Sequence, residues 1–336
     1  MEQKFKGKHF LTCDNWSKEE LDIIFDTAFE LKQNFKDEIP TRYLRDKTLF
    51  MIFFEQSTRT RNSMEAGMTQ LGGHAHDLTA DKMQLSHGES AKDTAIILSR
   101  MGHGIASRNC FYGIGNKYLS EMAEHSTKPV MSLQDDIYHP FQGIADLMTI
   151  FEYFGKDLKG LKVTVSWAYA DTHSKPLSVP QTQALLFPRY GIDLTIANPV
   201  DFPLSENIIR SAHRNAKIGG GSVNIVNDMD ESFEGAHIVI PKNWGGFGKY
   251  PIDYFLKNEN ECKKEMKEKL EMNKHWICDN KKIKLADDKV KLMHALPADR
   301  GHEVTNEVID NPEISIVFDE AENRLHTAKA IMAETM

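Results

Sequence analysis

Hydroxyl and guanidinium side chains gather in one short run between an apolar segment and an amphipathic one. The run consists of Ser57, Thr58, Arg59, Thr60 and Arg61. Residues 48–54 before it are continuously apolar, as in a buried strand, and residues 62–73 after it have helical spacing and end in two glycines. Amides at a helix start attract anions, hydroxyls add donors, and a guanidinium fork matches phosphate oxygens. The run therefore predicts a phosphate-binding site in which Arg59 and Arg61 supply the positive charge.

Three further polar clusters stand where predicted strands end or predicted helices begin. Arg108 follows the short apolar segment 104–107, and His139 and Gln142, three residues apart, open a predicted helix. Residues with this spacing share one face of a helix, so the imidazole and the amide can contact the same ligand. The third cluster is the turn at 294–297, which follows a strand candidate. Taken singly, these features suit a surface arginine, a helix cap or a turn proline as well as a ligand site.

Strand-like and helix-like segments alternate along the whole chain. A capping box of Ser17 and Glu20 opens the first predicted helix. The alternation predicts an α/β fold of two doubly wound domains, each a parallel sheet covered by helices. We expect a first domain of residues 1–147, with the C-terminal helix 321–336 packed back on it, and a second domain of residues 148–320. Ligands bind at the carboxyl ends of the strands in such sheets, which is where the polar clusters stand.

The composition narrows the class of protein. The 336 residues suit two domains, and 41 basic against 49 acidic residues give a net charge of −8, which provides no general attraction for nucleic acid or a membrane surface. The four cysteines lie far apart without a C-x-x-C pair, which indicates free thiols in a reducing compartment and no zinc site. Without a signal-peptide pattern or a run of about 18 apolar residues, the sequence predicts a cytoplasmic protein. The histidines of segment 74–76 are expected to be polar strand positions and not metal ligands.

Five motifs resemble the aspartate/ornithine carbamoyltransferase superfamily over nearly the full length of the chain. They are STRTR (57–61), QLSHGES (84–90), HPFQGIADLMTI (139–150), HALP (294–297) and DEAENRLHTAKAIM (319–332). The resemblance implies that the first domain binds carbamoyl phosphate and the second an amine acceptor, with no cofactor and no metal. It also implies a homotrimer with active sites at subunit interfaces, in which Gln84 reaches into a neighbouring subunit's site.

The resemblance also implies roles for individual residues. It assigns carbamoyl phosphate binding to Ser57, Thr58, Arg59, Thr60, Gln84, Arg108, His139, Gln142, Ala295, Leu296 and Arg324. A neutral amine attacks the carbamoyl carbon, so negative charge grows on the carbamoyl oxygen, and the implied catalytic donors to it are Thr60, Arg108 and His139. Arg59 and the helix terminus would stabilise the departing phosphate, so no nucleophilic serine or cysteine is required.

The segments that would select the acceptor differ from those of ornithine carbamoyltransferases. Those enzymes carry an SMG loop and an HCLP turn, whereas this chain has VIPKNWGGF at 239–247 and Ala295 in place of the cysteine. The Lys-Asn-Trp sequence at 242–244 and the loop 166–181 resemble the transcarbamylases for N-acetylornithine and N-succinylornithine and their relatives of unassigned acceptor. That subgroup has a trefoil knot, which the resemblance therefore implies in the second domain.

Three side chains of the second domain are candidate contacts of the acceptor. We expect Lys242 to hold a carboxylate, Trp244 to form an apolar or cation–π wall, and Arg300 to offer a second carboxylate contact. The alternatives are a core position for Trp244 and solvated surface positions for Lys242 and Arg300. Glu303 stands where the acetylornithine enzymes carry a lysine, and an acidic group there disfavours the acyl-amino-acid pose of those enzymes and could instead face a cationic or ureido acceptor.

Three functional hypotheses follow. The leading one is a carbamoyltransferase that moves the carbamoyl group of carbamoyl phosphate to the nitrogen of an amino-acid-like or amide acceptor and releases phosphate. The first alternative has ornithine or an N-acylornithine as the acceptor. The second is a non-catalytic paralogue that only binds carbamoyl phosphate. A decayed copy would have lost parts of the site, whereas the chain retains Arg59, Arg108, His139, Gln142 and Arg324.

Overall fold

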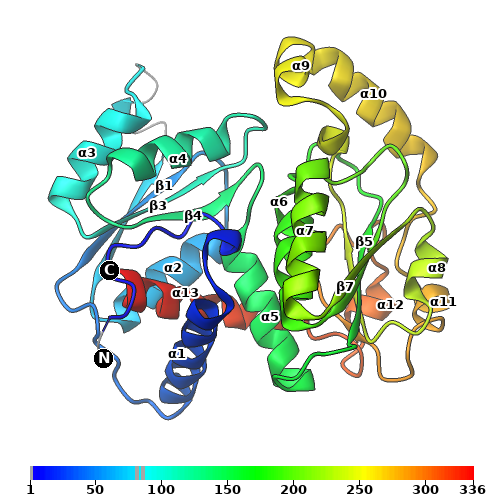
Figure 1. Cartoon of the computed structure of the whole chain (residues 1–336), viewed down its shortest axis with the longest axis horizontal. Helices are drawn as coiled ribbons and strands as arrows, with labels where there is room; N and C mark the ends of the chain where they lie inside the picture. Colours follow the sequence, from blue (N-terminus) through cyan, green and yellow to red (C-terminus); the bar gives the residue numbers. More distant parts are fainter. Residues whose placement is uncertain (1–2, 80–82, 85–87) are drawn as a thin grey trace. The chain divides into compact units, whose positions relative to one another are not determined.

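The computed structural model describes residues 3–79, 83–84 and 88–336, and the chain divides into two α/β units (Figure 1). Unit 1 comprises Met1–Met148 and Glu322–Met336, and unit 2 comprises Thr149–Ala321. Each unit is built on a parallel sheet, so the predicted fold class is confirmed. Residues 85–87 of the QLSHGES motif lie outside the described residues.

A four-stranded sheet in the order β2-β1-β3-β4 is the framework of unit 1. Its strands are β1 (Thr48–Phe53), β2 (His74–Thr79), β3 (Gly104–Asn109) and β4 (Val130–Asp135). Its helices are α1 (Lys18–Lys36), α2 (Arg59–Gln70), α3 (Ala91–Met101), α4 (Gly115–His125), and the parts of α5 (Pro140–Phe154) and α13 (Val317–Thr335) that fall in unit 1. Because Phe53 pairs with Arg108 in the parallel register, β1 and β3 end at the same edge of the sheet.

Buried aliphatic side chains hold these elements together. Ile52, Ile105 and Val130 of three neighbouring strands pack in one cluster with Ala95 of α3 and Leu119 of α4. The continuous apolar runs read from the sequence are therefore strands covered by helices, as expected for a parallel sheet.

The helix boundaries show where local sequence signals worked and where they did not. Ser17 accepts the backbone N–H of Glu20, and the Glu20 side chain accepts that of Ser17, so the predicted capping box is confirmed. Helix α2 begins at Arg59, earlier than the predicted residue 62. Its N-cap, Thr58, has helical backbone angles and makes no side-chain capping bond, so no cap signature marked the start. Arg59 and Thr60 consequently lie on the first turn of the helix.

Unit 2 contains a five-stranded parallel sheet in the order β7-β6-β5-β8-β9. Its strands are β5 (Lys162–Trp167), β6 (Asp193–Ala197), β7 (Ser222–Val226), β8 (Ile238–Lys242) and β9 (Lys291–Leu292). Its helices include α6 (Ser178–Leu186), α7 (Glu206–Gly219), α8 (Met229–Phe233), α9 (Ile252–Lys257), α10 (Glu259–Met272), α11 (Asn280–Ile283) and α12 (Asn306–Ile309). The trefoil knot expected from the resemblance stays a prediction.

The cysteines and the apolarity of the helices were also considered in the sequence analysis. Cys13, Cys110, Cys262 and Cys278 are all free thiols. Within the described ranges, no helix combines the length and apolarity needed to cross a membrane.

Candidate active site

Two guanidiniums lie near each other at the carboxyl edge of the unit 1 sheet. Arg59 stands on the first turn of α2, and Arg108 lies in β3 one residue before its end. Burial lowers the pKa of Arg59, and the positive charge of Arg108 lowers it further. A bound dianion would offset both effects, because it pairs with each guanidinium and relieves their mutual repulsion. The predicted roles of Arg59 at the phosphate and Arg108 at the carbamoyl group stay predictions.

A carboxylate that the sequence analysis missed lies beside one of these arginines. Glu55 follows β1; its Oε1 accepts the backbone N–H of Cys110 at 2.9 Å, and its Oε2 lies 4.0 Å from Nε of Arg108. Burial raises the pKa of Glu55, and the Cys110 amide and the Arg108 charge oppose that shift. Glu55 thereby ties the loop after β1 to the end of β3. The signal that could have revealed it was its place at the end of an apolar strand, just before the hydroxyl run.

A buried chain of hydrogen bonds connects helices α2, α5 and α13. Arg324 donates from Nη2 to Oγ1 of Thr60 at 2.7 Å and from Nη1 to Oε1 of Gln142. Gln142 in turn donates from Nε2 to Oδ1 of Asp146 at 2.6 Å. Since the Thr60 oxygen accepts from Arg324, the Thr60 hydroxyl proton is directed elsewhere. These hydrogen bonds bring three of the predicted site residues, Thr60, Gln142 and Arg324, together in unit 1.

His139 lies buried at the start of α5, in the electrostatic field of two arginines. Burial lowers its pKa well below the ordinary value, and the charges of Arg324 and Arg108 lower it further. His139 is therefore a neutral imidazole at neutral pH. A neutral ring still carries one N–H, so it can donate to a carbonyl oxygen without bringing a charge of its own.

The hydroxyl run itself divides into two kinds of residue. The side chain of Thr58 is exposed and that of Ser57 partly exposed. Arg61, expected to share the anion charge with Arg59, instead pairs with Asp77 of β2, and its guanidinium lies 4.1 Å from the centre of the Phe53 ring. The charge of Arg61 is thus matched by strand β2 in this structure, and its part in anion binding stays a prediction.

The HALP turn belongs to unit 2 and follows β9. The backbone N–H of His294 donates to Oε2 of Glu320 at 2.7 Å, and the N–H of Leu296 donates to Nδ1 of His294 at 2.9 Å. Leu296 has a φ of 43°, in the left-handed region that non-glycine residues seldom adopt. Ala295 is buried beside it. These bonds hold the backbone at Ala295 and Leu296 in one defined conformation.

The three candidate acceptor contacts differ in their surroundings. The Trp244 side chain is fully buried, and its indole N–H donates to the carbonyl of Phe202 at 2.9 Å, as a core residue does. Arg300 is largely exposed and pairs through both terminal nitrogens with Asp310, at 2.7 and 2.8 Å. Lys242 ends β8 with its side chain mostly buried.

Glu303 is buried against two lysines and does not face an exposed cleft. Its carboxylate is inaccessible to solvent, and its Oε1 lies 3.2 Å from Nζ of Lys242 and 3.2 Å from Nζ of Lys175. The expectation that this acidic group faces a cationic or ureido acceptor is therefore corrected, since its charge is matched within unit 2. Lys175, in the proline-containing loop after β5, was not singled out from the sequence because its partner lies more than a hundred residues away.

Gln84 lies between β2 and α3, and its side chain is exposed.

Among the described residues, no group of histidine, cysteine and acidic side chains is arranged to hold a metal ion.

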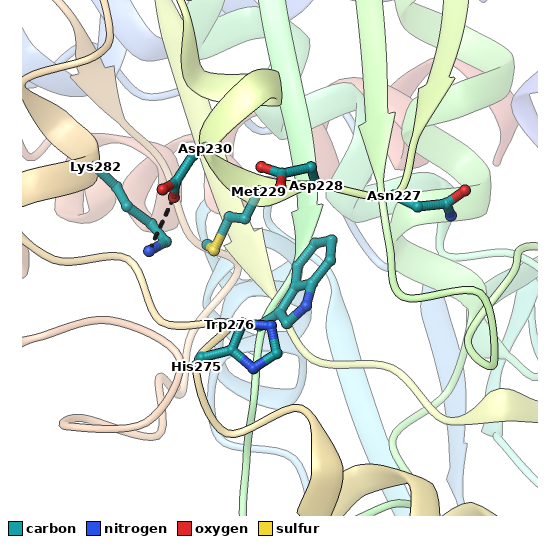
Figure 2. Close-up of a pocket in the computed structure, with 7 residues that line it drawn as sticks. All are labelled: Asn227, Asp228, Met229, Asp230, His275, Trp276 and Lys282. Carbon is teal, nitrogen blue, oxygen red and sulfur yellow. Dashed lines mark ion pairs between the residues drawn. The ribbon is translucent and has the colours of Figure 1, made fainter.

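A separate cavity of about 280 Å³ lies in unit 2 (Figure 2). It is lined by Asn227, Asp228, Met229, Asp230, His275, Trp276 and Lys282. Lys282 and Asp230 form an ion pair of 3.0 Å on one side, and Asn227 marks the opposite side. None of the predicted acceptor residues lines this cavity, so we do not identify it with the acceptor site.

Comparison with known proteins accounts for nearly the whole chain. Residues 8–152 match the aspartate/ornithine carbamoyltransferase carbamoyl-P binding domain, and residues 168–335 match the Asp/Orn binding domain. An ornithine carbamoyltransferase of Pyrococcus abyssi is 36% identical over 98% of this chain and 95% of its own length.

Solved structures show the same relationship. The ornithine carbamoyltransferase of Pyrococcus furiosus is 34% identical with a TM-score of 0.85, and the alignment covers 98% of this chain and 97% of that one. An acetylornithine transcarbamylase complexed with acetylcitrulline is 31% identical with a TM-score of 0.86, covering 97% and 98% of the two chains. The chain therefore belongs to the aspartate/ornithine carbamoyltransferase family and is a transferase of carbamoyl groups.

Proposed function

We propose a division of labour among the site residues for carbamoyl transfer from carbamoyl phosphate to an amino-acid-like or amide acceptor. Ser57, Thr58 and Arg59 hold the phosphate at the start of α2. The carbamoyl group is contacted by Thr60, Arg108, His139, Gln142 and Arg324, and by the backbone of Ala295 and Leu296. The observation that carries this assignment is the pair Arg59 and Arg108, whose proximity and partial burial favour a bound dianion.

The reaction needs donors aimed at the oxygen that gains charge. When a neutral amine attacks the carbamoyl carbon, negative charge develops on the carbamoyl oxygen, and each well-placed donor stabilises it by about 3 kcal/mol. Arg108 supplies a charged donor, the neutral His139 ring an uncharged one, and Thr60 a hydroxyl whose oxygen already accepts from Arg324. Collapse of the tetrahedral species then breaks the bond between the carbamoyl carbon and the phosphate oxygen, the departing phosphate takes up the proton that the amine loses, and phosphate stays paired with Arg59 until it leaves.

The acceptor is assigned to unit 2. We assign Lys242 to a carboxylate of an amino-acid-like acceptor, because the residue ends β8 at the carboxyl edge of the sheet, and because its ammonium has three N–H donors and can serve an acceptor as well as Glu303, which lies 3.2 Å away. The similar proteins are named for ornithine and N-acetylornithine, and these two amines are the alternative acceptors. Trp244 and Arg300 fit this role less well, since Trp244 is a core side chain and Arg300 already uses both terminal nitrogens on Asp310.

Phosphate release from carbamoyl phosphate across a panel of acceptors tests the function. The panel contains ornithine, N-acetylornithine, N-succinylornithine, aspartate, putrescine, diaminopropionate and oxamate. Release that depends on one class of acceptor identifies the substrate. Arg59→Ala should abolish carbamoyl phosphate binding, whereas Arg45→Ala, an exposed arginine of the same unit, should not. Retained binding in Arg59→Ala would contradict the phosphate assignment.

We further propose a cytoplasmic homotrimer with active sites shared between subunits. The free cysteines are compatible with a reducing compartment. Gln84 is proposed to contact carbamoyl phosphate bound by a neighbouring subunit. If so, inactive Gln84→Ala and Arg59→Ala chains should recover activity when mixed and reassembled, because some interfaces then combine intact Gln84 with intact Arg59. Light scattering measures the assembly, and the absence of recovery in verified mixed trimers would exclude shared sites.

A further inference from the structure

One buried carboxylate joins four separate segments of unit 2. Oε1 of Glu303 accepts the backbone N–H of Asn243 at 2.6 Å and lies 3.2 Å from the ammonium groups of both Lys242 and Lys175. Oε2 accepts the backbone N–H of Asp299 at 2.7 Å and lies 3.2 Å from Nε2 of His294. The side chain is wholly inaccessible to solvent. Glu303 thus connects the loop after β5, the end of β8, the HALP turn and the turn at Asp299.

Two ammonium groups and two carboxylates lie together in this cluster. Lys175 lies 2.9 Å from Oδ2 of Asp299, so the two ammonium groups face two carboxylates. Burial raises the pKa of Glu303, but Lys242, His294 and Lys175 outweigh it and hold the pKa well below the ordinary value. The carboxylate is consequently ionised throughout the neutral range. Its removal would leave Lys242 and Lys175 facing each other with one counter-charge.

The imidazole of His294 transmits this arrangement to the HALP turn. Its Nδ1 accepts the N–H of Leu296, so in the neutral ring the proton is on Nε2. Burial lowers the pKa of His294, which keeps the ring neutral. Nε2 faces the Glu303 carboxylate, which favours the tautomer protonated at that nitrogen. The carboxylate therefore selects the tautomer that holds the backbone at Leu296.

We propose that Glu303 is a positioning residue that couples the carbamoyl-binding turn at Ala295 and Leu296 to the acceptor-contacting Lys242, without touching either substrate. This inference rests on the proposed roles of those residues in carbamoyl transfer. It differs from a purely structural role in predicting that neutralising Glu303 impairs the acceptor half-site and the chemical step while the phosphate clamp of unit 1 is preserved.

Steady-state kinetics of Glu303→Gln test the proposal, with Glu303→Asp as the conservative variant and Glu206→Gln as the control. Glu206 is an exposed, ion-paired acid of unit 2, so its neutralisation alters charge but no buried cluster. Glu303→Gln is expected to lower kcat/KM for the acceptor by about 100-fold through both kcat and KM. Carbamoyl phosphate affinity, measured by calorimetry, should stay within about threefold. Glu303→Asp, which keeps the charge, should recover about a tenth or more of the wild-type kcat/KM.

A second variant tests the route through the imidazole. His294→Asn retains an acceptor atom for the Leu296 N–H but cannot sense Glu303 through Nε2. The double variant should therefore lose less than the product of the two single losses. Multiplicative losses, wild-type kinetics in Glu303→Gln, or a change in acceptor KM alone would each overturn the proposal. If Glu303→Gln does not fold, the comparison of Glu303→Asp with His294→Asn decides. Absence of acceptor-dependent phosphate release in the wild type would instead refute the proposed function.

Discussion

Replacing Arg324 by lysine separates the charge of this residue from its forked geometry. In the structure the two terminal nitrogens of Arg324 donate to Thr60 and to Gln142 at once. A lysine ammonium keeps the charge but cannot reproduce two parallel bonds on a planar fork. A hydrogen bond to a charged group contributes about 1.5–3 kcal/mol, so the variant should lose about that amount. At about 1.4 kcal/mol per factor of ten, kcat/KM should fall about 10- to 150-fold.

The assay is acceptor-dependent phosphate release at saturating and limiting carbamoyl phosphate, with Arg45→Lys as the matched control. Arg45 has a side chain that is 77% exposed and lies in the same unit. Circular dichroism and a denaturant midpoint establish that the variant is folded. If Arg324→Lys keeps kcat/KM within about threefold of wild type, the forked bond to Thr60 and Gln142 does not prepare the site.

Three further changes test other features of the structure. Burial lowers the pKa of Lys329 from 10.5 to about 8, so the unfolded chain binds the proton of this ammonium more tightly than the folded chain does. The free energy of unfolding should therefore rise between pH 8 and 10.5, by up to about 3 kcal/mol. The free energy of unfolding of Lys329→Met, measured with urea, should not show this rise. Parallel pH profiles of that free energy for the variant and the wild type would contradict the prediction. Arg61→Met removes the ion pair with Asp77 and the contact over the Phe53 ring. It should therefore cost about 1–2 kcal/mol of stability and leave carbamoyl phosphate affinity nearly unchanged. A large loss of affinity would show that Arg61 binds the anion. Trp244→Phe leaves the buried Phe202 carbonyl without its donor and should cost about 2–3 kcal/mol of stability with little change in acceptor KM; a large KM increase without loss of stability would place Trp244 at the acceptor.

Local patterns in the sequence predicted much of the fold. The apolar run before Ser57 is a buried strand, and the capping box at Ser17 opens a helix, because both signals act over a few neighbouring residues. The resemblance indicated the family, which the comparisons established. The start of helix α2 was not predicted correctly, because Thr58 forms no side-chain capping bond and no local sequence signal marks this helix start.

The sequence by itself determined the order of elements, the parallel α/β class and the set of residue types able to bind an anion. Only the tertiary structure decided which of those residues are available. Arg61 is matched by Asp77 because helix α2 packs against strand β2, and Trp244 is buried against Phe202. Glu303 meets Lys242 and Lys175 although 61 and 128 residues separate them in the chain. Ion pairing and burial depend on distances in space, and a parallel sheet with long crossovers brings together residues whose separation in sequence carries no signal.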